Sequence, residues 1–149
     1  MNRFQKISLF LNRVSMGWLM FYAGITKIMN PAWSAAGYLG SAKTFAGFYQ
    51  WFLRPDVLPF TNFINEWGLT LLGVSLILGL FVRLTSIGGA ALMMLYYFPV
   101  LQFPHVSAHS YIVDEHIIYA LVLVALVVMR AGQVWGLDSK FPKLSRWLG

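Results

Sequence analysis

Long apolar segments alternate with short polar connections along this chain. Four segments stay mostly apolar for about 20 residues, the length that a helix needs to cross a bilayer. The first follows Arg3 and Lys6, but Asn12 and Arg13 interrupt it early and it runs on too long for a signal peptide. We therefore predict a retained span there, and the four predicted spans cover about residues 7–29, 60–82, 84–103 and 111–130.

Composition favours lipid as the surrounding solvent. Of 149 residues, 58% are hydrophobic and 11% are charged, whereas ordinary soluble domains are about 25% charged. A soluble domain of this size exposes too much surface to hide so many apolar side chains. The lack of cysteine excludes disulfides, iron–sulfur ligation and covalently attached haem. The expected fold is an all-α integral membrane four-helix bundle, with residues 1–149 forming a single domain.

The basic residues predict the orientation of this bundle, because cytoplasmic flanks carry an excess of Lys and Arg. An N-in/C-in arrangement leaves only Lys27, Lys43 and Arg54 outside. We interpret the net charge of +6 as this topology signal, and we expect a multi-pass protein of a bacterial or archaeal cytoplasmic membrane without a nucleic-acid partner. The inner flanks hold Arg3, Lys6, Arg83, Arg130, Lys140, Lys143 and Arg146, and the tail KFPKLSRWLG is expected on the anionic inner surface.

The connection over residues 30–59 is too aromatic for a flexible linker. Aromatic residues crowd positions 45–52, and Lys43 and Arg54 bracket them. A short helix lying in the membrane interface has this pattern. A loop folded over the mouth of the bundle explains it equally well, so the sequence leaves both interpretations open.

Both positively charged residues inside the first span lie on one face of the predicted helix. Steps of three or four residues align Arg13, Gly17, Met20, Gly24 and Lys27. Glycines let a neighbouring helix approach closely, and charged side chains in a span need a partner. The stripe is therefore predicted to face protein, with snorkelling to the headgroups as the alternative for either cation.

Glu66 and Glu115 fall near the outer ends of their predicted helices, as Lys27 does. We expect these three residues to meet in one outer-leaflet cluster and to be the catalytic groups, exchanging protons. Asp114, Glu115 and His116 cannot all point inward, since consecutive helical residues lie about 100° apart. We assign Asp114 to the helix start, Glu115 to the interior and His116 to the interface.

A flat, amphipathic pocket near these carboxylates would suit a quinone headgroup, which needs aromatic walls and a few hydrogen-bonding groups. An interfacial aromatic belt is the simpler explanation of the same residues. His105, His109 and His116 lie at the outer rim, so no metal site is predicted. The residues that could line the pocket are Asn62, Trp67, Tyr96, Tyr97 and Gln102, and the substrate-binding set that we predict is Arg13, Trp67, Tyr97, Tyr119 and Gln102.

The chain resembles the DoxX-like family of small four-helix membrane proteins, which includes the small DoxD-type subunit of thiosulfate:quinone oxidoreductase. The resemblance rests on RVSMGWLMFYAGITKIMNP, EWGLTLLGVSLILGLFVRLTSIGG and DEHIIYALVLVALVVMRAGQVWGLD, in that order. It implies importance for Arg13, Lys27, Glu66, Arg83, Glu115 and Asp138. Among these, Arg83 and Asp138 are assigned structural roles, as is Asp114.

Three functions follow from these observations. The first is a small subunit of a quinone-linked redox complex, in which a partner protein supplies electrons. No covalently bound cofactor is expected there, and a quinone is the possible ligand. The second is a non-catalytic structural or assembly subunit of a larger membrane complex. The third, a small transporter, is the least favoured because four spans without a repeat make a poor transporter. Whether the chain is an enzyme is left open.

Overall fold

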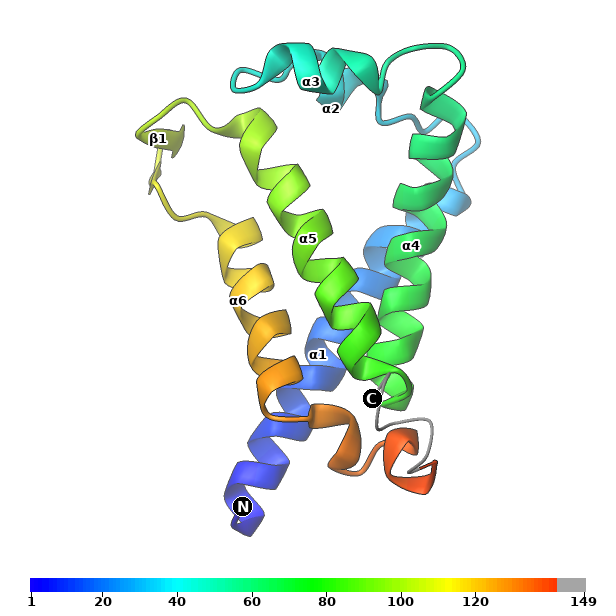
Figure 1. The fold of residues 1–149 in the computed structure, drawn as a ribbon, viewed down its shortest axis with the longest axis vertical. Helices are drawn as coiled ribbons and strands as arrows, with labels where there is room; N and C mark the ends of the chain where they lie inside the picture. The colour runs from blue at the N-terminus through cyan, green and yellow to red at the C-terminus, as the bar shows by residue number, and fades with distance from the viewer. Residues whose placement is uncertain (142–149) are drawn as a thin grey trace.

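The computed structural model describes residues 1–141, which fold mainly into helices (Figure 1). Residues 142–149 lie outside the described part, and with them most of the predicted tail, including Lys143, Arg146 and Trp147. The long helices are α1 (Arg3–Ile28), α4 (Leu58–Leu78), α5 (Val82–Val100) and α6 (Glu115–Val128). The short elements are α2 (Ala36–Gly40), α3 (Ala46–Trp51), a hairpin of β1 (His105–Ser107) and β2 (Ser110–Tyr111), and the 3-10 turns η1 (Ala131–Gln133) and η2 (Leu137–Lys140).

The four long helices pack side by side around one apolar core. Helix α1 lies along α4, and α5 lies along α6, while a tight turn at Gly79 joins α4 to α5. Gly79 ends α4 in the left-handed conformation, with a φ of 68°, which glycine adopts without a steric penalty. The core is formed mainly by Met16, Met20, Leu69, Leu72, Leu76, Met93, Leu123 and Leu126.

The contact between α1 and α4 depends on glycines. A Cβ at Gly17 would lie 2.9 Å from the backbone nitrogen of Ile77. A Cβ at Gly24 would overlap the backbone of Thr70, and one at Gly73 would overlap the backbone of Phe21. The prediction that the glycine stripe of the first helix allows close approach of a neighbour is confirmed.

The predicted membrane-spanning fold is wrong. Within residues 1–141, no helix combines the length and the apolar character needed to cross a membrane. The four predicted spans coincide with α1, α4, α5 and α6, but α6 has 14 residues, about 21 Å of helix against a hydrocarbon layer of about 30 Å. Helices α1 and α4 are longer but are interrupted by Asn12 and Arg13, and by Asn65 and Glu66. The integral four-helix membrane bundle with N-in/C-in topology is therefore not the fold that the structure supports.

The connection between α1 and α4 folds across the upper end of the helices, where α2 and α3 lie (Figure 1). Tyr49 of α3 is buried there in a second apolar cluster with Ala35 and Leu39. The interpretation of a segment folded over the mouth of the helices is confirmed. Its outer face exposes Phe45, Phe48 and Trp51, while the interpretation as an interfacial helix stays a prediction.

Helix α6 begins at an aspartate, as expected. The carboxylate of Asp114 accepts hydrogen bonds from the backbone N–H groups of His116 at 3.0 Å and Ile117 at 3.2 Å. These are two of the N–H groups that the first turn of a helix leaves without a partner. The assignment of Asp114 to the helix start is confirmed.

Removing this cap should destabilise α6. Asp114→Ala is expected to lower the free energy of unfolding by about 1–2 kcal/mol. Asp114→Asn keeps an acceptor oxygen and should stay within about 0.5 kcal/mol of the wild type. Denaturation followed by circular dichroism in mild detergent measures both, and an unchanged Asp114→Ala variant would contradict the capping role.

Candidate functional site

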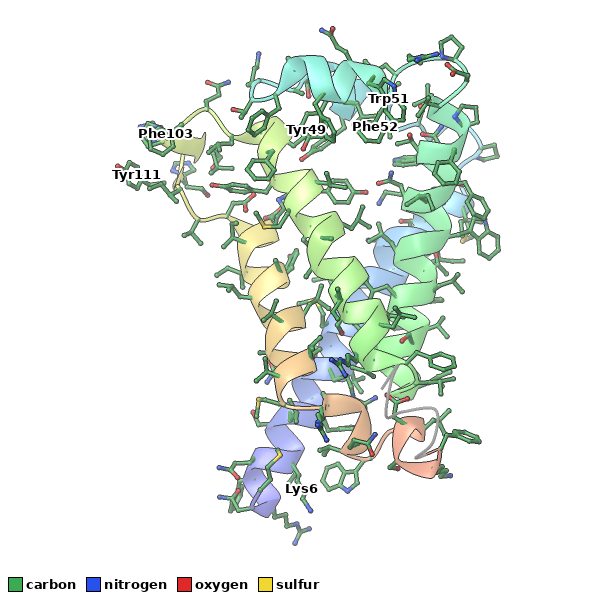
Figure 2. All side chains as sticks on the ribbon, viewed as in Figure 1. Lys6, Tyr49, Trp51, Phe52, Phe103 and Tyr111 are labelled. Atoms are coloured by element: carbon green, nitrogen blue, oxygen red, sulfur yellow. The ribbon has the colours of Figure 1, made fainter. Side chains whose placement is uncertain are left out.

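A pocket of about 290 Å³ lies at the upper end of the molecule, and we call it the upper pocket. Its walls come from the end of α1, the connection with α2 and α3, the first turns of α4 and the last turns of α5. Figure 2 shows Tyr49 and Phe52 beneath α3, on the side facing the long helices. The lining consists of Lys27, Trp33, Ser34, Ala35, Tyr38, Leu39, Tyr49, Phe52, Phe60, Thr61, Ile64, Asn65, Leu92, Leu95 and Tyr96.

Hydrogen bonds to the protein hold the polar side chains of this wall in place. The Tyr38 hydroxyl donates to the backbone oxygen of Tyr96, and the Tyr96 hydroxyl donates to Oδ1 of Asn65. Asn65 Nδ2 in turn donates to the oxygen of Thr61 at 2.7 Å. The Tyr49 hydroxyl donates to the oxygen of Leu95 at 3.0 Å. The bonds of Tyr38 and Tyr49 join the connection between α1 and α4 to α5, and the bond of Tyr96 joins α5 to α4. The aromatic walls are therefore held in place before a ligand binds.

Lys27 is the charged residue of the upper pocket. Its Nζ donates to the oxygen of Ala23, one turn earlier, at 2.8 Å and lies 5.4 Å from the centre of the Trp33 ring. Partial burial lowers the pKa of Lys27, because desolvation disfavours the ammonium. The position of Lys27 at the end of the glycine-lined face of α1 thus brings a cation to an aromatic wall.

The rear of the pocket is supported by a pair that the sequence did not reveal. Nδ1 of His116 lies 2.7 Å from Oδ2 of Asp114, and the imidazole stacks on the ring of Tyr96 with centroids 5.7 Å apart. The aspartate therefore both caps α6 and orients the histidine. His116 was assigned to the interface without a functional role, but its side chain is half-buried behind Tyr96, a residue of the pocket wall.

The predicted catalytic cluster of Lys27, Glu66 and Glu115 does not assemble. No ion pair joins Lys27 to either glutamate within residues 1–141. Glu66 is half-buried on α4 and does not line the upper pocket, and Glu115 is exposed. The prediction that Glu115 turns inward is wrong, because the turn of α6 that Asp114 starts directs His116 toward Tyr96 instead.

The predicted substrate-binding residues are dispersed over the molecule. Trp67 and Gln102 are exposed, and Tyr119 packs against the core. Tyr97 is buried with its hydroxyl donating to the oxygen of Ile112. The adjacent Tyr96 lines the pocket in its place, since the helical step of about 100° turns the two rings apart. Arg13 lies near the opposite end.

Arg13 is fully buried, with 0% of its surface exposed, so it faces protein as predicted and does not snorkel. Its Nη1 donates to the oxygen of Leu76 at 2.9 Å, and its Nη2 lies 3.3 Å from the oxygen of Val134 and 3.4 Å from that of Trp135. Leu76 is in the last turn of α4, where carbonyls lack helical partners. Burial lowers the pKa of Arg13, and the charge of Asp138 partly opposes that shift.

Asp138 completes this lower network from the C-terminal side. The side chain is 1% exposed and accepts from the backbone N–H groups of Phe81 at 2.8 Å and Val82 at 3.2 Å, at the start of α5. Its own N–H donates to the oxygen of Gly79 at 2.9 Å. Arg13 and Asp138 thus satisfy the two helix ends of the α4–α5 turn. Arg83, in the first turn of α5, is exposed.

Metal ligands do not gather in the described part of the chain. Residues 1–141 contain no group of three His, Asp or Glu side chains placed to hold a metal ion. His105 and His109 are exposed in the hairpin. Tyr111 of the hairpin and Phe103 just before it point away from the helices (Figure 2).

Comparison with known families identifies the chain. The family profile described as DoxX matches residues 8–102. This protein belongs to the DoxX family. No curated protein and no solved structure matches it. The matched segment contains the whole lining of the upper pocket, from Lys27 to Tyr96, whereas Asp114, Glu115 and Asp138 lie beyond it.

Membership of the DoxX family indicates a small membrane protein of a kind often associated with redox complexes. The outward faces of all four long helices suit contact with lipid. They expose large apolar side chains, which soluble monomers rarely gather in extended patches, among them Leu11, Trp18, Leu71, Ile87, Leu121 and Val128.

Proposed function

We propose that this DoxX protein is a membrane-associated subunit of a quinone-linked redox complex at a bacterial or archaeal cytoplasmic membrane, and that the upper pocket binds the quinone headgroup. The observation that carries the proposal is an aromatic pocket with a lysine ammonium at its wall. A partner protein of the complex supplies the electrons, because none of the residues that line the pocket is a reductant for a quinone.

The pocket fits a quinone ring in size and chemistry. Its volume of about 290 Å³ is close to the lower limit of about 300 Å³ for small-molecule sites. Trp33, Tyr38, Phe52 and Tyr96 offer flat faces against which a ring can stack. The exposed side chains of Phe60 and Ile64 leave room for a hydrophobic tail to extend from the ring toward lipid.

A quinone, when bound, supplies reversible uptake of electrons and protons. The task of the protein is to hold the ring and to place a hydrogen-bond donor at one carbonyl oxygen. Lys27 has that role, since its ammonium carries three N–H donors and uses one on Ala23. Its lowered pKa brings the amine closer to exchanging that proton at neutral pH than an exposed lysine would be.

Filling the pocket tests this proposal. Leu95 is one of the residues that line the pocket, and Leu95→Trp is expected to weaken binding of 1,4-naphthoquinone by about tenfold or more, equivalent to about 1.4 kcal/mol. Ile87→Trp is the matched control, because Ile87 lies on the same helix but is exposed away from the pocket. Isothermal titration calorimetry in mild detergent measures both, and equal affinity of the two variants would refute the pocket as the quinone site.

A non-catalytic docking subunit is the second candidate, favoured by the exposed aromatic face of α3. Phe45, Phe48 and Trp51 are exposed together on one short segment, and exposed apolar patches mark contact surfaces. Purification from membranes discriminates between the two functions. A partner that stays bound to wild type and to Leu95→Trp alike, with no quinone binding to either, would favour docking.

A further inference from the structure

The upper pocket contains a charge that the protein does not balance. Lys27 lines it, and no aspartate or glutamate does. The ion pairs of the described chain, Arg54 with Asp56 and His116 with Asp114, leave Lys27 out. A cation that is partly removed from water without a counter-charge costs free energy. A ligand that brings a negative charge would remove this cost on binding.

Most other polar side chains of the wall already donate to protein oxygens, and Ser34 keeps a neutral O–H while its oxygen accepts from the backbone N–H of Ala36. The hydroxyls of Tyr38, Tyr49 and Tyr96 donate to protein oxygens, and Asn65 bridges Tyr96 and Thr61. Lys27 is different, because its Nζ donates to Ala23 and keeps two further N–H donors. The strongest hydrogen-bonding capacity that remains for a ligand is therefore cationic.

The tyrosines cannot supply the missing negative charge. Burial, with smaller contributions from nearby charges such as Asp114, raises the pKa of Tyr38 to about 12. Burial raises the pKa of Tyr96 as well, with a smaller contribution from Tyr38. Both phenols therefore stay neutral near pH 7, and the ring beside Lys27, that of Trp33, is neutral as well.

We infer that the upper pocket selects an acidic quinone, a flat ring that carries an ionised hydroxyl or carboxyl group and pairs it with Lys27. The inference rests on the proposed function in taking this pocket as the quinone site, and it adds the charge of the ligand. The ring stacks among the aromatic side chains, and the anion lies beside Nζ of Lys27 near the Trp33 end of the pocket. A charge-assisted hydrogen bond of this kind is about twice as strong as a neutral one.

Three related ligands test the inference on the purified chain in mild detergent. They are 1,4-naphthoquinone, which is neutral, 2-hydroxy-1,4-naphthoquinone, which is an anion at pH 7, and 2-naphthoate, which is an anion but not a quinone. We expect the wild type to bind the hydroxyquinone at least about tenfold more tightly than the neutral quinone, a difference that one charge-assisted bond can supply. Isothermal titration calorimetry gives the dissociation constants.

Variants of Lys27 assign the preference to its charge. Lys27→Met should abolish the tenfold preference, because the hydroxyquinone loses its charge-assisted bond while 1,4-naphthoquinone loses only a weaker hydrogen bond to a neutral carbonyl oxygen. Lys27→Arg should keep the preference, since it keeps the positive charge. Because Lys27 is a partly buried cation without a counter-charge, an apolar replacement should not prevent folding. Lys27→Gln is a second neutral variant, and circular dichroism checks that each variant is folded.

The outcomes separate this inference from the proposed function. Equal affinity for both quinones in wild type and Lys27→Met would overturn the acidic selectivity and leave the quinone site standing. Failure of both quinones to bind would overturn the proposed function. In that case 2-naphthoate decides, because binding that depends on Lys27 would still support an anion-selective aromatic pocket, and its absence would end the inference as well.

Discussion

Arg13→Met is expected to lower the free energy of unfolding by about 3–5 kcal/mol, the typical cost of removing one member of a buried charged network. The substitution leaves the oxygens of Leu76, Val134 and Trp135 without their donor, and each buried unsatisfied group costs about 1–3 kcal/mol. It also leaves Asp138 as a buried carboxylate without its nearby cation. Since domains have a total stability of about 5–15 kcal/mol, the variant should be close to unfolding.

Chemical denaturation in mild detergent, followed by circular dichroism, measures this effect. Arg83→Met is the matched control, because Arg83 is exposed, and it should change stability by no more than about 0.5 kcal/mol. The double variant Arg13→Met/Asp138→Asn should lose less than the sum of the two single losses, since the two residues serve one network. An Arg13→Met variant as stable as the control would show that the lower network contributes nothing.

Gly73→Ala is expected to destabilise the protein by about 3 kcal/mol, the upper end of the usual cost of overpacking. The new methyl group would overlap the backbone nitrogen and Cα of Phe21 on α1. Backbone atoms cannot rotate away as a side chain can, so α1 and α4 must separate along their length. Because Lys27 lies on α1 and Asn65 on α4, the upper pocket should lose its shape along with the helix contact.

Gly88→Ala provides the control for the change in helix propensity. No atom lies within 4 Å of a Cβ built at Gly88 in the middle of α5, so alanine should stabilise that helix by about 1 kcal/mol. The same denaturation measurement, together with the affinity for 1,4-naphthoquinone, reports on both variants. Similar effects of the two substitutions would mean that the α1–α4 contact tolerates a methyl group and that the glycine is not needed for close packing.

The helices could be located from the sequence because their signals are local. Runs of apolar residues and the aspartate at position 114 mark starts and ends that the structure reproduces within a few residues. Whether each helix spans a membrane could not be read from local signals in the same way. The composition favoured complete spans, but α6 is too short, and the polar residues inside α1 and α4 lower their apolar character.

The candidate site was predicted only in part. Lys27 was identified because the glycine stripe directs its helix face toward protein. Trp33 and Tyr38 were not, because the connection in which they lie has no periodic pattern from which a buried face can be read. The exchange of roles between Glu115 and His116 has a similar cause, since one step of about 100° at the start of α6 decides which side chain reaches Tyr96.

The sequence by itself determined where the four long helices lie and that α1 presents a glycine face, with Arg13 on it, for close packing. These features depend on apolar length, residue size and spacing within one segment. Only the tertiary structure decided which polar groups meet: Arg13 with the helix ends near Asp138, and Lys27 with aromatic rings in place of the expected glutamates. These contacts between polar groups depend on the rotation of each helix about its axis and on the path of the connections. Both are set by packing between segments that are far apart in the chain.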